Sequence, residues 1–205
     1  TQSTAIGSQA LASASDSYAI GSDAEAAAKR STAIGTDSTA VGTRSTAIGT
    51  QASSTARRST AIGSQALASA SDSYAIGSNA EAAATRSTAI GTDSTAIGTQ
   101  STAIGSQALA SASDSYAIGS KARATKQNSL AFGSGARSTH LNSLAIGTQA
   151  RSLGHASTAI GTDSTAAGSS SIAIGTGSNA TGYKSTAIGF AAQAHRNNEM
   201  ALGTR

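Results

Sequence analysis

The chain has 205 residues, of which 38% are hydrophobic, 3% aromatic and 12% charged, with no Pro, no Cys and a formal net charge of +4. Most of the apolar residues are Ala, which buries too little surface to fill one globular core. Absence of Cys excludes disulfides and thiolate metal sites, and the scattered Lys and Arg with few aromatic residues argue against nucleic-acid binding.

A seven-residue register runs along the chain. Cut from Ser3, it reads STAIGSQ, ALASASD, SYAIGSD, AEAAAKR and continues without insertion or deletion to EMALGTR at 199–205, which makes 29 heptads. The third residue of each heptad is Ala except at Ser54, Ser138 and Ser152. This regularity predicts one repeat domain over residues 1–205, in which each unit contacts only its neighbours.

The fourth heptad position reveals a longer repeat of 14 residues. Every second heptad places a large apolar side chain there: Ile6, Ile20, Ile34, Ile48, Ile62, Ile76, Ile90, Ile104, Ile118, Phe132, Ile146, Ile160, Ile174, Ile188 and Leu202. Alternate heptads mostly carry a small or polar residue, with Val41 and Ile97 as the clearest exceptions. Residues 3–49 recur almost verbatim at 59–105, so whole repeats have been duplicated.

Along the chain, the STAIG-like motifs predict short strands, and the Gly-Thr/Ser-Asp/Gln that follows each predicts a turn. The segments AEAAAKR (24–30) and AEAAATR (80–86) have a helical composition. They are too short for isolated helices between Gly-containing motifs, so we expect β structure there. The frequent Gly and the lack of a second apolar position also exclude a coiled coil. Two strand–turn halves make one coil, and about 14 coils should stack as an all-β parallel solenoid.

The size of one coil decides which side chains fill it. A 14-residue coil is too tight for large side chains, so we expect the repeated Ala to point inward and the Ile to point outward. The outward residues would form an apolar stripe along the coils. A stripe of that length is expected to be covered by self-association rather than by water.

The motif S-x-A-I-G-x-x followed by A/S-x-A-x-x-x-x stands here as STAIGSQ-ALASASD, SYAIGSD-AEAAAKR, NSLAFGSGA and NSLAIGTQA. It resembles the head of YadA-like trimeric autotransporter adhesins over essentially the whole chain. The resemblance implies a left-handed parallel β-roll, with three identical chains side by side and the fifteen large residues above in the trimer core. It also implies attachment to host cells or extracellular matrix proteins such as collagen, at the outer membrane of a Gram-negative bacterium. The neck, stalk and C-terminal membrane anchor of that family do not occur in this sequence, so we expect an excised head.

No arrangement of residues predicts catalysis, a metal site or a cofactor. His140, His155 and His195 lie in different repeats with no shared ligand spacing, and no base recurs beside the many Ser and Thr. The single Gly of each motif does not form a phosphate-binding pattern. We therefore expect ordinary surface or turn roles for these residues, and no enzyme.

A local binding surface is predicted in the more variable, basic repeats near the C-terminal end, between 121 and 151 and between 184 and 205. The candidate ligand residues are Lys121, Arg123, Lys126, Arg137, Arg151 and Arg196. Two other functions remain open at this stage. A stiff spacer that projects another domain would need the same repeats, whereas an ice-binding solenoid would need Thr-x-Thr ladders that the sequence lacks.

Overall fold

The computed structural model describes residues 2–203, and these contain strands and turns but no helix. Each heptad contributes one strand of two or three residues and one turn, so that two heptads complete a coil. The predicted all-β parallel solenoid, with a 14-residue repeat and about 14 coils, is confirmed. Two compact units divide the chain, unit 1 at residues 1–101 and unit 2 at 102–205.

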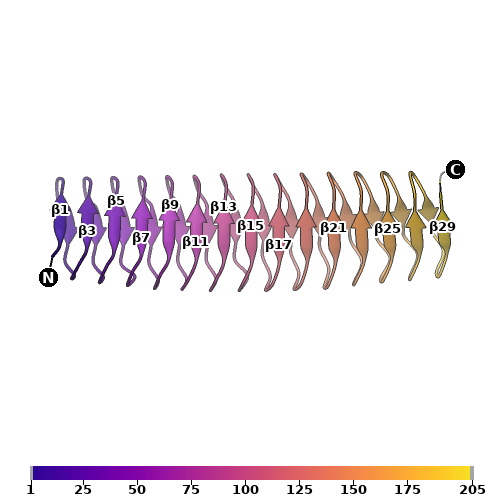
Figure 1. Ribbon diagram of the computed structural model, residues 1–205, viewed down its shortest axis with the longest axis horizontal. Helices are drawn as coiled ribbons and strands as arrows, with labels where there is room; N and C mark the ends of the chain where they lie inside the picture. Colours follow the sequence, from indigo (N-terminus) through magenta and orange to yellow (C-terminus); the bar gives the residue numbers. More distant parts are fainter. Residues whose placement is uncertain (1, 204–205) are drawn as a thin grey trace. The chain divides into compact units, whose positions relative to one another are not determined.

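Unit 1 contains two parallel sheets built from alternate strands (Figure 1). The three-residue strands are β1 (Thr4–Ile6), β3 (Tyr18–Ile20), β5 (Thr32–Ile34), β7 (Thr46–Ile48), β9 (Thr60–Ile62), β11 (Tyr74–Ile76) and β13 (Thr88–Ile90). The two-residue strands are β2 (Leu11–Ala12), β4 (Glu25–Ala26), β6 (Thr39–Ala40), β8 (Ser53–Ser54), β10 (Leu67–Ala68), β12 (Glu81–Ala82) and β14 (Thr95–Ala96).

Unit 2 repeats the same alternation. Its three-residue strands are β15 (Thr102–Ile104), β17 (Tyr116–Ile118), β19 (Leu130–Phe132), β21 (Leu144–Ile146), β23 (Thr158–Ile160), β25 (Ile172–Ile174), β27 (Thr186–Ile188) and β29 (Met200–Leu202). Its two-residue strands are β16 (Leu109–Ala110), β18 (Arg123–Ala124), β20 (Arg137–Ser138), β22 (Arg151–Ser152), β24 (Thr165–Ala166), β26 (Asn179–Ala180) and β28 (Gln193–Ala194).

Strand pairing places equivalent residues of successive coils side by side. In β3 and β5, for example, Ala19 pairs with Ala33 and Ile20 with Ile34, an offset of one 14-residue repeat. The segment 24–30, whose composition is helical, forms strand β4 and a turn as predicted. Because every coil pairs in the same register, each sequence position becomes a straight row of side chains.

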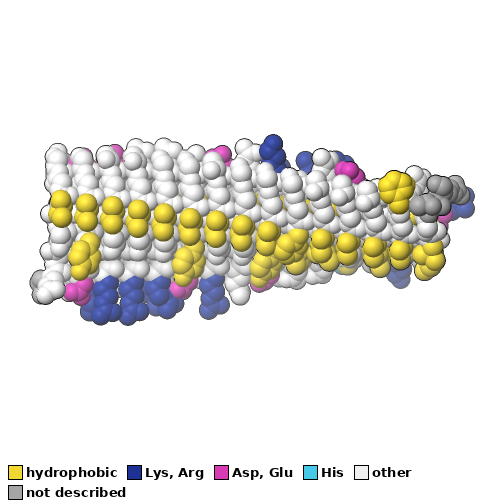
Figure 2. All heavy atoms as spheres, turned by 45° about the horizontal axis from the view of Figure 1, so that its top comes forward, with side chains coloured by type: hydrophobic (Ala, Val, Ile, Leu, Met, Phe, Trp, Pro, Cys, Tyr) yellow, Lys and Arg dark blue, Asp and Glu magenta, His cyan; other side chains and the backbone are white. Residues whose placement is uncertain are grey.

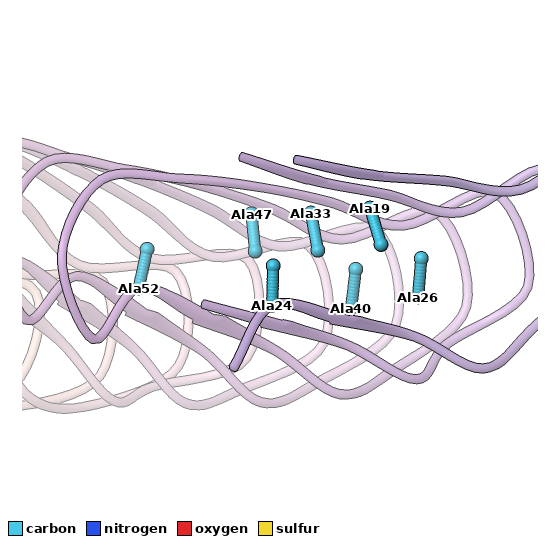
Figure 3. Close-up of a cluster of buried hydrophobic side chains, with 7 residues drawn as sticks. All are labelled: Ala19, Ala24, Ala26, Ala33, Ala40, Ala47 and Ala52. Carbon is cyan, nitrogen blue, oxygen red and sulfur yellow. The ribbon is translucent and has the colours of Figure 1, made fainter. Parts of the chain in front are cut away.

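The first and third residues of each heptad point into the coil, where only small side chains fit. Ala residues at the third position are almost all fully buried. Figure 3 shows Ala19, Ala33 and Ala47 of one sheet pointing toward Ala26 and Ala40 of the other. The inward direction of Ala is thus confirmed, and the narrow interior explains why no large apolar side chain is fully buried.

The first heptad position is often Ser, which is buried as completely as Ala. The Ser31 hydroxyl donates to the carbonyl of Ala28 at 2.6 Å and accepts from the N–H of Ala28 at 3.2 Å, which closes the preceding turn. A buried hydroxyl is stable only when it is hydrogen-bonded, and the turn supplies the partners. Most serines at this position close a turn of the interior in this way, whereas the buried hydroxyls of Ser45, Ser171, Ser178 and Ser185 have no hydrogen-bond partner within residues 2–203.

The three heptads that replace the third Ala by Ser have a common structure. Ser54 lies 2.6 Å from the hydroxyl of Ser59 in the same coil. Ser138 with Ser143, and Ser152 with Ser157, form the same pair at 2.6 Å. Each additional hydroxyl is hence matched by a serine that is already present, and the interior accepts it without an unpaired polar group.

Every turn also contains a residue with positive φ at the seventh heptad position. Among the described residues, twenty-six non-glycine residues have φ near +55°, including Asp23, Arg30 and Lys121. The sequence analysis did not predict this conformation. The position that follows Ile requires Gly for a different reason, because its φ is near +130° and the backbone of the next coil lies against it. At Gly63, for example, an added Cβ would lie 2.4 Å from the carbonyl oxygen of Gly77.

Candidate interaction surfaces

The outer face of the three-residue strands, here called the Ile face, carries the predicted apolar stripe. None of the fifteen large residues at the fourth heptad position is buried, and their exposed fraction ranges up to 57% at Ile6 and 68% at Leu202. Figure 2 shows the stripe as a yellow row that continues from coil to coil. The outward direction of Ile is confirmed, and each unit exposes an apolar row that no part of the same unit covers.

A second row on the Ile face is formed by the second heptad residue. In unit 1 this row is mostly Thr, interrupted by the exposed Tyr18 and Tyr74. In unit 2 it becomes more apolar, with Tyr116, Ile172 and Met200 exposed. The Ile face of unit 2 is therefore apolar across two rows, whereas that of unit 1 is apolar along one.

The outer face of the two-residue strands, here called the back face, holds three of the six predicted ligand residues. Arg123, Arg137 and Arg151 occupy one row because β18 pairs with β20 and β20 with β22 in register. All three side chains are exposed. Like charges opposite one another in a sheet are unfavourable unless an anion reduces their repulsion, so this arginine row is suited to a negatively charged partner.

The other three predicted ligand residues are placed differently. Lys121 ends the turn before β18, and Lys126 lies in the turn after it, so both flank the arginine row. Arg196 lies in the turn after β28, three coils beyond Arg151, and is not part of the cluster. The structure thus brings five of the six residues into one region. The 14-residue spacing of the three arginines in the row could have been read from the sequence.

The two turns of each coil form two edges that border the Ile face. The first corner is the turn that follows a three-residue strand, and the second corner is the turn that follows a two-residue strand. In unit 1 the second corner carries all of the Lys and Arg: Lys29, Arg30, Arg44, Arg57, Arg58 and Arg86. Figure 2 shows them as a dark blue group along one edge. Sequence reasoning treated these charges as scattered and missed this edge.

One ion pair lies on the second corner of unit 1. Arg58 and Asp72, one repeat apart, are joined by Nε–Oδ1 at 2.6 Å and Nη2–Oδ2 at 2.8 Å. The hydrogen bond from Arg58, together with its charge, lowers the pKa of Asp72. Both side chains are partly exposed, so solvent screens the pair and its contribution to stability is small.

Near the end of unit 2, Glu199 occupies a first heptad position that is usually Ser. Its carboxylate accepts the backbone N–H groups of Arg196 at 2.7 Å and His195 at 2.6 Å, and these hydrogen bonds lower its pKa. The three histidines are exposed in separate turns, as expected. Within residues 2–203, no group of His, Asp and Glu could hold a metal ion, and no helix could cross a membrane.

Comparison with known proteins addresses the repeat itself. The model of the family described as "YadA head domain repeat (2 copies)" matches residues 1–17, 12–38, 40–66, 68–94, 96–122, 124–150, 152–178 and 180–205. These matches span the chain from end to end. The chain belongs to the YadA head domain repeat family. The predicted resemblance is therefore confirmed, and the chain is an adhesin-type head rather than a member of an enzyme family.

Among solved structures, the chain is similar to the collagen-binding domain of the Yersinia adhesin YadA. The two are 24% identical, the match covers 80% of this chain and 69% of the other, and the TM-score is 0.31. Collagen binding is a property of that domain. No curated protein matches the chain.

Proposed function

We propose that this YadA head assembles as a homotrimer through its Ile face and attaches a bacterial cell to a host surface or to an extracellular matrix protein. The observation that carries the proposal is the uncovered apolar row, with seven large residues in unit 1 and eight in unit 2. In the cell the head would be extracellular and held at the outer membrane by an anchor outside this sequence.

The energetics favour assembly. Nine of the fifteen outward residues are partly buried and six are exposed. Covering the remaining area contributes about 1 kcal/mol per side chain at the usual value for buried apolar surface. Fifteen such residues per chain give a total that is large compared with the entropic cost of association. A stack of coils also presents many equivalent contacts, which suits multivalent attachment along its length.

Sedimentation equilibrium and circular dichroism on the same sample test the assembly. We expect a β-rich species of three times the 19.8 kDa chain mass. Ile48→Asp together with Ile62→Asp should prevent assembly, because both side chains lie in the apolar row. The control is Leu67→Asp with Leu109→Asp, which adds the same charges on the outer face of the two-residue strands β10 and β16 and should leave the trimer intact. A folded monomeric wild type would contradict the proposal.

For attachment, we propose that the arginine row of the back face contacts the partner, with Lys121 and Lys126 beside it. The row is exposed and lies on the sheet opposite the Ile face, so that assembly through the Ile face leaves it accessible. Acidic side chains or sulfated groups of a matrix protein would suit the planar guanidinium groups.

Binding of the trimer to immobilised fibrillar collagen and to cultured epithelial cells tests this surface. Replacing Arg123, Arg137 and Arg151 by Ser should weaken attachment and reduce its sensitivity to salt. The control replaces Lys184 by Glu and Arg196 by Ser, which lowers the net charge by the same three units outside the arginine row. Unchanged attachment of the arginine variant would overturn the assignment of this surface. No attachment of the wild type to either probe would favour a spacer instead.

A further inference from the structure

The two corners of the coil carry opposite charges at similar heights along the stack. This arrangement bears on how neighbouring chains contact one another in an assembly. We propose that, in the trimer of the proposed function, ion pairs between the second corner of one chain and the first corner of the next hold neighbouring chains in register. The inference rests on that trimer, and it assigns the charged corners to the contact between chains.

Charge is segregated between the two edges of unit 1. The second corner holds the six Lys and Arg together with Asp16 and Asp72, whereas the first corner holds Asp23, Asp37 and Asp93 and no cation. These three aspartates are exposed. The Ile face therefore has one positive edge and one negative edge.

The two edges cannot neutralise each other within one chain. One strand segment of five residues separates the first corner from the second, which is on the order of 15 Å in extended conformation and too far for an ion pair. Among the described residues of unit 1, the ion pair Arg58–Asp72 is the only one, and both of its members lie on the second corner. The three aspartates of the first corner thus have no oppositely charged partner in their own unit.

Like charges on the second corner are also held close together. The N–H of Arg44 donates to the carbonyl of Lys29 at 2.9 Å, and that of Arg58 to Thr43 at 3.0 Å, so successive corners stack at the strand spacing. The six side chains Lys29, Arg30, Thr43, Arg44, Arg57 and Arg58 surround a hollow of about 280 Å³. Carboxylates entering this hollow would reduce the repulsion between the cations.

The levels of the charges agree with pairing between parallel chains. A three-fold axis along the stack keeps equivalent residues of the three chains at the same height. Arg30 lies half a coil after Asp23 and half a coil before Asp37, and Arg86 lies half a coil before Asp93. Half a coil is about 2.4 Å along the stack, which a long arginine side chain easily spans.

Two further cases agree with the rule that opposite charges on the two corners lie half a coil apart. In unit 2 the first corner carries a cation, Lys121, and the second corner half a coil earlier carries an acid, Asp114. Arg58 lies between the uncharged Gln51 and Gln65 of the first corner, and it is the arginine that pairs within its own chain. The rule does not extend to Asp163 and Lys184, whose counterparts are uncharged, or to Asp16, which lies half a coil before Asp23. The charged contact is therefore confined to residues 23–121.

The duplicated segments vary these charges together. Residues 3–49 and 59–105 differ at four positions, and the second copy has Asn79 for Asp23, Thr85 for Lys29, Ile97 for Val41 and Gln100 for Arg44. Three of these differences remove a charge, one from the acidic corner and two from the basic corner. Acid and base are lost in the same copy, as expected if they contact each other across chains.

Opposite edges meet when parallel chains pack around an axis along the stack. In a cyclic trimer each chain presents one edge to one neighbour and the other edge to the other neighbour, so that positive meets negative at all three contacts. An antiparallel two-fold contact would instead bring equal edges together, with repulsion between like charges. The charge arrangement therefore favours parallel packing of the chains over antiparallel packing.

Charge reversal tests the contact in the full chain. Asp23→Lys with Asp37→Lys places cations on both edges at these levels, and Arg30→Asp with Arg44→Asp places carboxylates on both. Either pair should raise the concentration for half-assembly by about ten-fold or more, because opposed like charges at an interface are strongly unfavourable. All four changes together should restore assembly. Lys121 and Asp16 show that each new residue type is compatible with positive φ at this position.

The matched control is Glu25→Lys with Glu81→Lys, which makes the same charge change on the back face and should assemble like wild type. Circular dichroism verifies that each variant folds. If the wild type is trimeric and the reversals have no effect, or the fourfold variant is not restored, the corner contact is wrong and the trimer stands. If the wild type is monomeric, the proposed assembly fails, and the contact fails with it.

Discussion

Two glycines of one turn, Gly133 and Gly135, should respond very differently to an added side chain. Gly133 has φ near +128°, and an added Cβ would lie 2.5 Å from the carbonyl oxygen and 2.6 Å from the carbonyl carbon of Gly147 in the next coil. Gly135 has φ near +68°, and the nearest atom to its Cβ would be Gln149 Cγ at 3.6 Å. The change is Gly133→Ala, and the control, two residues away, is Gly135→Asn.

The expected cost of Gly133→Ala has two parts. A side chain at this φ costs about 1–3 kcal/mol in backbone strain. The overlap with Gly147 is with backbone atoms and cannot be relieved by a rotamer change. The coils must separate locally, which weakens hydrogen bonds such as that from Gly147 N–H to Phe132 at 2.8 Å, at about 1 kcal/mol each. The total loss in free energy of unfolding is about 3 kcal/mol.

Gly135→Asn should be nearly neutral. Asn79 has φ of 54° at the same first-corner position of another coil, so this backbone already accepts asparagine. The small residual strain is offset by the reduced entropy of the unfolded chain, which stabilises by about 0.4–1 kcal/mol. We expect a change within about 1 kcal/mol of wild type.

Urea unfolding followed by circular dichroism measures both variants, at one protein concentration because assembly contributes to apparent stability. The reasoning predicts a clearly lower midpoint for Gly133→Ala and an unchanged midpoint for Gly135→Asn. Equal midpoints for Gly133→Ala and wild type would refute the steric argument. Equal destabilisation by both changes would refute the distinction between the two glycine positions.

Two further predictions concern polar groups. Ser59→Ala removes hydrogen bonds to Ser54 and to both backbone groups of Ala56, and it should lower the free energy of unfolding by about 1–3 kcal/mol. Ser54→Ala restores the residue that is usual at this position and should lower the free energy of unfolding by less than about 1 kcal/mol. Urea midpoints that rank the two variants in the opposite order would contradict this prediction. Since the folded pKa of Asp72 is lowered by Arg58, the stability from this pair is present above the ordinary carboxyl pKa and is lost as pH falls through the folded value. An NMR titration of the Asp72 carboxyl should show its pKa rise in Arg58→Gln, and an unchanged value would refute the assigned cause.

The interior could be predicted because one coil is so small. A 14-residue coil leaves room for Ala and not for Ile, and this alone determines which face of STAIG is inside. The buried Ser at the first position could not be predicted in the same way, because Ser is common in turns and on surfaces. Its place depends on the turn carbonyl that accepts its proton, as at Ser31 and Ala28, and that geometry is visible only in the structure.

The turn geometry was harder to read from residue types. Asp and Asn at the seventh position are typical of positive φ, but Arg30 and Arg44 adopt the same conformation without that preference. Stacking explains this result, because every coil must follow the turn of the coils above and below it. Hydrogen bonds between successive corners, such as Asp37 N–H to Ser22 at 3.0 Å, impose one backbone path on whatever residue is present.

The candidate surfaces were only partly predicted, because charges were considered along the sequence and not down the columns of the repeat. Reading the second position of alternate heptads gives Arg123, Arg137 and Arg151 in one row. Reading the seventh position places Asp23, Asp37 and Asp93 on the first corner and Arg30, Arg44, Arg58 and Arg86 on the second. Since the structure pairs equivalent positions in every coil, the columns correspond to surfaces, and a chain with this repeat can be read in two dimensions.

The two copies at 3–49 and 59–105 indicate how such a chain acquires different surfaces without losing its fold. All inward positions are identical between the copies, and the four differences lie at outward or turn positions. An inward change would have to fit a neighbour above and below, whereas an outward change meets only solvent or another molecule. Variation is therefore concentrated at positions that can contact partners. The loss of Asp23 together with Lys29 and Arg44 in the second copy agrees with the proposed ion pairs between neighbouring chains.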